Sequence, residues 1–299
     1  MLVPVTVTDE RGAFVRGLGL ADFALYDGGV RREIASVDSF DSALAPVSLV
    51  VAIQTSGISG PALVRIRKVS SLIHTFVTGA RGAAAVLAFD ERLEWLQEFT
   101  RDPDALFNAF TKLKPGADRA ARMHDAVVEA CAKLELRPNS RRVILLISES
   151  KDRGSEAGLE AALEAAQRAG AAVYSASYSV YASAFASKPS DARGISGGFD
   201  LGAALGELFR LGKINTVNAL AAGTGGAQLK FVSQKALESA ILQLGEELHG
   251  QYVLSFVPAQ DVSGYRTLEV RVAGGGKLTL RARPGYFAET GRAGGPHFE

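Results

Sequence analysis

The chain has 299 residues, of which 47% are hydrophobic and 22% charged, and its formal net charge is +1. This composition predicts a folded protein and excludes a disordered one. The 33 basic and 32 acidic residues are intermixed along the chain. That excludes the charge excess with which proteins bind nucleic acid or acidic membranes. No stretch reaches the roughly 18 consecutive apolar residues that a membrane span requires.

Residues 1–45 have the alternating pattern of β-strands. LVPVTVTD and VRREIASVDSF alternate apolar and polar residues, and FALYDGG between them ends in a turn sequence. No signal-peptide pattern precedes the first strand. The compartment stays open: we expect a secreted or periplasmic protein if a leader is missing from this sequence, and a cytoplasmic one otherwise.

Residues 46–250 alternate between strands and helices. The runs VSLVVAI, AAAVLAF and RRVILLIS are continuously apolar, which is typical of strands that helices cover on both faces. RLEWLQEF reads as an edge strand containing Trp95. Apolar residues recur at helical spacing in the segments 61–77, 102–113, 122–136, 155–170, 214–226 and 234–248. This order predicts a doubly wound, mostly parallel α/β sheet flanked by helices.

Residues 251–288 return to the β pattern, in QYVLSFVP, YRTLEVRV and KLTLRARPGYF. A few isolated strands are marginally stable in water, so we expect this segment to pair with residues 1–45 in a small all-β domain. Residues 179–213 are predicted to form a surface loop with a helical end at 201–211. The tail 289–299 is predicted to be flexible.

Catalytic motifs are absent from the sequence. It contains no nucleophile elbow, P-loop or Rossmann fingerprint, and we therefore predict that the protein is not an enzyme. Cys131, the only cysteine, lies in an apolar helical stripe and is predicted to be buried. Asp90 is predicted to lie in a turn between two strands, and Tyr178 to be a packing residue.

Residues 46–250 contain the stretches VSLVVAIQTSGISG, RRVILLISESKDRGS and LEAALEAAQRAGAAVYSASY, in this order. On these stretches, residues 46–250 resemble a von Willebrand factor type A (vWA) domain. With its flanking β segments, the whole chain is similar to bacterial vWA-related proteins. The resemblance implies a Rossmann-like sheet with a Mg²⁺ site at the carboxyl ends of its strands. In that family, D-x-S-x-S, a threonine and a later aspartate supply the oxygen ligands, and an acidic group of the partner completes the metal shell.

This sequence departs from that metal motif at four of five positions. The motif positions fall on Gln54, Ser56, Ile58, Ala121 and Glu149. Gln54 lacks the charge of the leading aspartate, and Ile58 offers no ligand where the second serine is expected. Ser59 lies one residue beyond that position. Mg²⁺ loses its water reluctantly, so the resemblance here implies a degenerate site that holds no metal.

We therefore predict a non-enzymatic interaction module that needs no cofactor and binds an unidentified protein partner. The predicted binding face consists of Gln54, Thr55, Ser56, Ile58, Ser59, Asp118, Ala121 and Glu149. Two alternatives stay open. Asp118, Ser56 and Glu149 could form a rearranged Mg²⁺ site for metal-dependent adhesion, or the chain could be an assembly component that pairs through its terminal β segments. The oligomeric state is not predicted.

Overall fold

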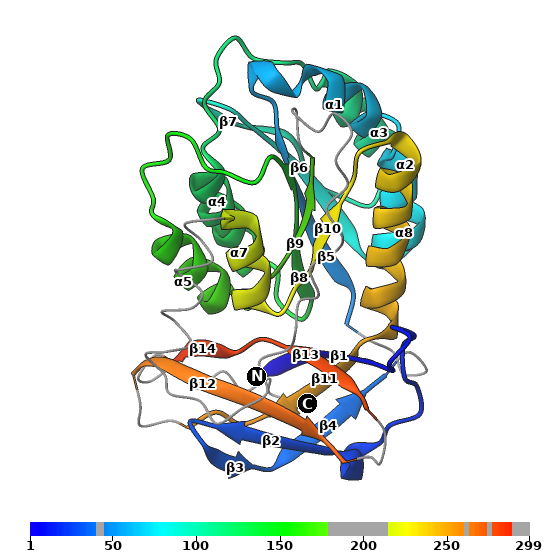
Figure 1. Ribbon diagram of the computed structural model, residues 1–299, viewed down its shortest axis with the longest axis vertical. Helices are drawn as coiled ribbons and strands as arrows, with labels where there is room; N and C mark the ends of the chain where they lie inside the picture. The colour runs from blue at the N-terminus through cyan, green and yellow to red at the C-terminus, as the bar shows by residue number, and fades with distance from the viewer. Residues whose placement is uncertain (40–44, 179–214, 260–262, 274–276, 289–299) are drawn as a thin grey trace. The chain divides into compact units, whose positions relative to one another are not determined.

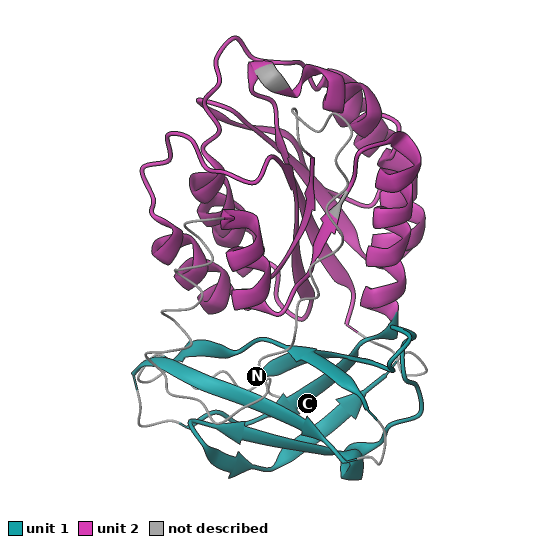
Figure 2. Ribbon diagram, viewed as in Figure 1, with its two compact units in different colours: residues 1–44, 250–299 teal, residues 45–249 magenta. Residues whose placement is uncertain are grey.

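The computed structural model describes residues 1–39, 45–178, 215–259, 263–273 and 277–288. The predicted loop over 179–213, with its helical end at 201–211, and the tail 289–299 lie outside the described residues. The chain forms two compact units, one of residues 1–44 with 250–299 and the other of residues 45–249 (Figure 2).

A six-stranded sheet forms the centre of the unit 45–249, in the order β10-β9-β8-β5-β6-β7. Its strands are β5 (Val47–Gln54), β6 (Ala83–Phe89), β7 (Leu93–Thr100), β8 (Arg141–Ser148), β9 (Ala172–Ser177) and β10 (Gln228–Lys230). All neighbouring strands are parallel except β6 and β7, which are antiparallel. Every residue of β5 is buried, which explains its continuous apolar run. The predicted mostly parallel α/β sheet is confirmed.

Helices cover both faces of this sheet (Figure 1). One face carries α1 (Gly60–Ile66), α2 (Ser70–Leu72), α3 (Pro103–Lys112) and α8 (Gln234–Gly250), and the other carries α4 (Met123–Glu135), α5 (Leu159–Ala169) and α7 (Thr216–Thr224). Each face has its own apolar core, one including Leu63 and Phe110 and the other including Val127 and Leu163. Cys131 is buried in the second core, as predicted, and burial raises the pKa of its thiol.

The segment 61–77 is not the single helix that its periodicity predicts. It is divided into α1, α2 and a π-helical turn η3 (Ile73–Thr78). The apolar positions Leu63, Ile66, Ile73 and Val77 are nevertheless all buried against the sheet. The spacing of apolar residues fixes the buried face of such a segment, but it does not distinguish a continuous helix from an interrupted one.

Gly226, between α7 and β10, lies directly against the backbone of β9. A Cβ atom added to it would be 2.0 Å from the carbonyl oxygen of Val173. We expect Gly226→Ala to lower the free energy of unfolding by about 2 kcal/mol through overpacking. In Gly60→Ala the nearest atom would be Pro115 Cβ at 3.9 Å, so this control should differ from the parent by no more than about 0.5 kcal/mol. Urea unfolding measures both, and equal losses would contradict the steric argument.

The other unit is built from two four-stranded antiparallel sheets, ordered β13-β1-β11-β4 and β14-β12-β2-β3. Its strands are β1 (Leu2–Thr8), β2 (Phe23–Asp27), β3 (Val30–Arg32), β4 (Ile34–Asp38), β11 (Tyr252–Phe256), β12 (Gly264–Val272), β13 (Thr279–Ala282) and β14 (Gly285–Ala288), with the short 3-10 turn η1 (Leu20–Asp22). β1 pairs with both β11 and β13, so strands from the N-terminal and C-terminal segments share one sheet. Val5, Leu25 and Leu254 lie in its apolar core.

The run VRREIASVDSF crosses between these sheets. Its first part is β3, at the edge of one sheet, and its second part is β4, at the edge of the other. Only Glu33 separates the two strands. An alternating pattern specifies the inward and outward sides of a strand, but it does not specify the sheet that the strand joins.

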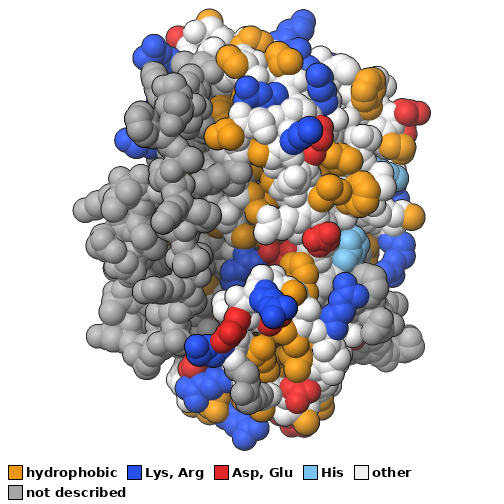
Figure 3. All heavy atoms as spheres, turned by 45° about the vertical axis from the view of Figure 1, so that its right-hand side comes forward, with side chains coloured by type: hydrophobic (Ala, Val, Ile, Leu, Met, Phe, Trp, Pro, Cys, Tyr) orange, Lys and Arg blue, Asp and Glu red, His pale blue; other side chains and the backbone are white. Residues whose placement is uncertain are grey.

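The surface has no dominant charge on the face that Figure 3 shows. Exposed hydrophobic side chains there are interspersed with both basic and acidic ones, in agreement with the net charge of +1. None of the helices in the described parts of the chain has the length and apolar character needed to cross a membrane.

Candidate functional site

The carboxyl ends of three neighbouring parallel strands bring polar side chains together. Gln54 ends β5, Glu149 follows β8 and Tyr178 follows β9, and these strands are adjacent in the order β9-β8-β5. All three residues are buried. Loops at the carboxyl ends of parallel strands are where α/β sheets place their binding groups, so this edge is the candidate site.

Gln54 joins two of these strand ends through its side-chain amide. Its Oε1 accepts a hydrogen bond from the backbone N–H of Glu149 at 2.9 Å. Its Nε2 donates to Ser56 Oγ at 2.7 Å. The side chain is 0% exposed, so both ends of a buried neutral amide are satisfied by the protein.

Ser56 and Ser59 extend this contact to the third strand. Their hydroxyl oxygens lie 3.2 Å apart, and Tyr178 OH donates to Ser59 Oγ at 2.8 Å. Burial raises the pKa of Tyr178, outweighing the hydrogen bond with Ser59, which lowers it. The phenol is therefore a neutral donor at physiological pH. We call Gln54, Ser56, Ser59, Glu149 and Tyr178 the strand-end network.

The charge of Glu149 is balanced by an arginine. Glu149 Oε2 lies 3.1 Å from Arg153 Nη1, although the two atoms do not have the geometry of a directed hydrogen bond. Arg153 is held in place because its backbone pairs with that of Ala121 in both directions, at 2.8 and 2.9 Å. Ala121 is fully buried. The position where the vWA motif has its threonine therefore anchors the loop that carries Arg153.

Asp125, at the start of α4, also holds the loop that carries Arg153, through hydrogen bonds to its backbone. Its carboxylate accepts the N–H groups of Glu156 and Ala157 at 3.0 and 2.8 Å and the Nε of Arg122 at 2.7 Å. Burial raises the pKa of Asp125, but the two N–H groups and Arg122 together lower it further than burial raises it. The loop after β8 is thus tied to α4 by an ionised carboxylate.

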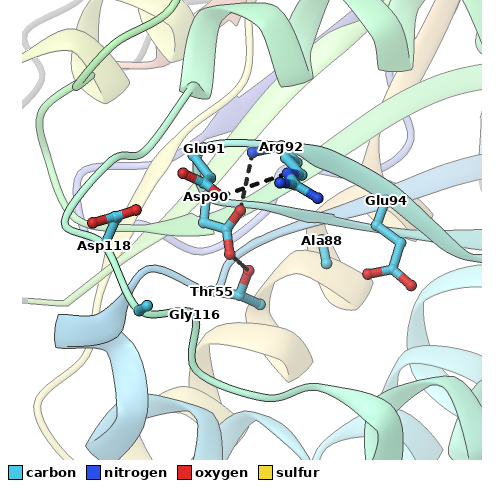
Figure 4. A pocket seen from close by; sticks show the side chains of 9 residues that line it. Thr55, Ala88, Asp90, Glu91, Arg92, Glu94, Gly116 and Asp118 are labelled. Carbon is cyan, nitrogen blue, oxygen red and sulfur yellow. Dashed lines mark hydrogen bonds and ion pairs between the residues drawn. The ribbon is translucent and has the colours of Figure 1, made fainter.

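A cavity of about 280 Å³ adjoins the network at the end of β6 (Figure 4). It is lined by Thr55, Ala88, Asp90, Glu91, Arg92, Glu94, Gly116, Ala117 and Asp118. Asp90 lies in the predicted turn, where its N–H donates to Arg92 O at 3.0 Å. Its carboxylate also accepts a long hydrogen bond of 3.4 Å from the hydroxyl of Thr55.

The residues of the predicted binding face are divided between the strand-end network and the neighbouring cavity. Gln54, Ser56, Ser59 and Glu149 come together in one network, whereas Thr55 and Asp118 line the neighbouring cavity. Ile58 lies in the 3-10 turn η2 (Gly57–Ser59), and its side chain is outside the described part of the structure. Two contributors escape the sequence patterns: Tyr178, which they predict to be a packing residue, and Arg153.

The donor atoms of the strand-end network do not match the requirements of a divalent cation. The N–H of Gln54 points at Ser56, and Arg153 lies against Glu149. Mg²⁺ needs an octahedral set of oxygen ligands, with carboxylates among them. Within the described residues, no three His, Cys, Asp or Glu side chains are grouped so that they could hold a metal ion.

No protein-family model matches this sequence, and no curated protein matches it. Among solved structures, a von Willebrand factor type A protein from Catenulispora acidiphila is similar with a TM-score of 0.50 at 14% identity, covering 89% of this chain and 73% of that chain. The conserved hypothetical protein BatB from Bacteroides thetaiotaomicron has a TM-score of 0.47 at 14% identity, covering 67% and 99%. The six-stranded unit has the vWA fold.

The strand-end network lies where the vWA fold places its metal motif. The metal motif of the resemblance falls on Gln54, Ser56, Ile58, Ala121 and Glu149, at the edge where the structure places the network. In this chain an amide, hydroxyl groups and an arginine make the cross-links between strand ends. These groups hold the vWA loops together through hydrogen bonds and one ion pair.

Proposed function

We propose that this protein is a non-catalytic interaction module of the vWA type, whose strand-end face binds a protein partner without a divalent cation. The proposal rests on the two hydrogen bonds of the Gln54 side chain, one with Ser56 and one with the backbone of Glu149. These contacts join loops that a cation would otherwise bridge. The binding face is then organised before any partner or ion arrives.

The chemistry of the network supports binding over catalysis. Ser56 and Ser59 are 0% exposed and hydrogen-bonded to one another and to their neighbours. The strand-end network contains no histidine that could act as their base. Their hydroxyl groups therefore serve as cross-links, and recognition falls to the exposed rim, which includes Asp118.

Metal titration tests the cation-free part of this proposal. We expect calorimetric titration of Mg²⁺, Mn²⁺ and Ca²⁺ to give no saturable heat, and the melting temperature to be equal in EDTA and in millimolar MgCl₂. A ligand that binds only the folded state raises its stability in proportion to its saturation, so a bound cation would be visible in both readouts. Saturable binding with thermal stabilisation would overturn the proposal in favour of a rearranged Mg²⁺ site.

Comparative capture tests the binding part. We expect the immobilised chain to retain the same protein from its native extract in EDTA and in MgCl₂, and to lose it on Asp118→Arg. Asp118 is exposed, so its replacement leaves the network intact. Glu160→Arg, an exposed position on α5, is the matched control and should retain the protein. Capture that requires MgCl₂, or that survives Asp118→Arg, would contradict the proposed face.

A further inference from the structure

β7 forms an open edge of the six-stranded sheet. It is the last strand in the sheet order, and within the described residues it pairs only with β6. It is eight residues long. An edge strand of this length has backbone N–H and C=O groups available to hydrogen-bond an added strand, as in proteins that bind extended peptides.

The start of this edge is acidic. Asp90, Glu91, Glu94 and Asp118 line the cavity at the end of β6, and Arg92 is the only basic residue among its lining side chains (Figure 4). Arg92 lies 3.5 Å from Glu91. Among the described residues, neither Glu94 nor Asp118 has an ion-pair partner. Glu94 and Asp118 therefore bring two negative charges to this cavity that no basic side chain of the described residues pairs with.

The charges along β7 identify which occupant fits. The β7 strand of a second copy does not fit, because it contains no lysine or arginine to place in the acidic cavity. A metal ion does not fit either, because the described residues hold no suitable group of three His, Cys, Asp or Glu side chains. A flexible basic side chain needs no such coordination geometry.

We propose that an extended, basic segment of a partner protein adds to β7 as a new edge strand and inserts a lysine or arginine into the acidic cavity. Strand pairing supplies the backbone hydrogen bonds, and Glu94, which belongs to both β7 and the cavity, sets the register. This inference rests on the proposed function, because Thr55 and Asp118 of the strand-end face line the same cavity. The resemblance implies that a vWA domain with a bound metal ion contacts an acidic group of its partner. The partner group proposed here is basic instead.

Trp95 provides a direct reporter of this binding. It is the only tryptophan in the chain, and it is the third residue of β7. Its Nε1 donates to Glu129 at 2.9 Å, and Lys133 Nζ lies 4.9 Å from its ring centre. A strand added beside Trp95 changes the solvent around the indole, and therefore changes its fluorescence.

The test uses capped peptides of alternating lysine and valine, titrated into the full chain in EDTA and again in MgCl₂. We expect saturable quenching or a spectral shift of Trp95, lost in a peptide with glutamate in place of lysine. It should also be lost in a lysine peptide with alternate N-methylated amides, which cannot pair as a strand. Glu94→Lys should weaken binding by about tenfold because an attraction becomes a repulsion, whereas Glu160→Lys should leave it unchanged.

The outcomes separate this inference from the proposed function. Absence of binding by the lysine peptide, equal binding by its N-methylated form, or equal binding by Glu94→Lys each overturns the strand-addition proposal. Binding in MgCl₂ but not in EDTA instead overturns the cation-free function. Glu94 is exposed, so Glu94→Lys should retain the circular dichroism of the parent, which confirms that the comparison is between folded proteins.

Discussion

Gln54→Glu is expected to lower the free energy of unfolding by about 4 kcal/mol at pH 7, the largest effect of any substitution at the candidate site. Glutamate has the same shape as glutamine, so packing is preserved. It replaces the Nε2 donor to Ser56 with an acceptor and puts a negative charge at a position that is 0% exposed. Arg153 already pairs with Glu149, and is therefore committed elsewhere.

The loss should depend on pH in a defined direction. Burial without a positive partner raises the pKa of the introduced carboxyl above its unfolded value of about 4.3. Protonation restores a donor for Ser56 and removes the charge. The destabilisation should therefore be largest above the raised pKa and should shrink toward zero as the pH falls below about 4.3. Chemical unfolding of parent and variant over this pH range measures the difference.

Two comparisons make this prediction decisive. Gln97→Glu changes a half-buried glutamine on β7 that bonds only the carbonyl of Glu98, and should cost no more than about 0.5 kcal/mol. Adding MgCl₂ to Gln54→Glu should leave its stability unchanged. Recovery of stability by Mg²⁺ alone would show that the loops keep a cation cage, and would contradict a network closed by hydrogen bonds and one ion pair.

The sequence predicted the sheet well because burial on both faces leaves a strong local signal. β5, β6 and β8 were visible as continuous apolar runs, and the replacement of the leading aspartate by Gln54 could be read directly. The hydrogen-bond network at the strand ends could not be predicted from the sequence. Tyr178 and Ser59 are 119 positions apart, and no local pattern distinguishes a tyrosine that only packs from one that also donates to a distant hydroxyl.

Arg153 was missed for a similar physical reason. A basic residue in a polar loop usually points into solvent, and only the pairing of its backbone with that of Ala121 directs it toward Glu149. This pairing uses backbone groups alone, so neither side chain leaves a sequence pattern that predicts it.

Arg141→Met is expected to lower the free energy of unfolding of the six-stranded unit by about 3 kcal/mol. Arg141, at the start of β8, is 7% exposed. Its Nε donates to the carbonyl of Ala45 at 3.0 Å, and its Nη1 donates to that of Leu248. Ala45 and Leu248 lie at the two ends of the unit 45–249, so one side chain ties together the segments by which the chain enters and leaves it.

Two opposing effects determine the size of this loss. Burial lowers the pKa of Arg141 to about 10, opposed by Tyr174 and reinforced by Arg81, which shows that holding the charge inside is itself unfavourable. Methionine removes that cost and fills similar volume, but it leaves two carbonyl groups without their donor. Each unpaired buried group costs about 1–3 kcal/mol, so the unpaired carbonyls outweigh the relief.

The fluorescence of Trp95, which lies within this unit, follows its urea unfolding separately from the other unit. Arg119→Met, at an exposed position, is the matched control and should change stability by no more than about 0.5 kcal/mol. Hydrogen exchange at the amides flanking Ala45 and Leu248 should accelerate in Arg141→Met alone, because the carbonyls that Arg141 holds are at the ends of the unit. Unchanged exchange there, with stability lost elsewhere, would assign Arg141 to packing and not to this tie.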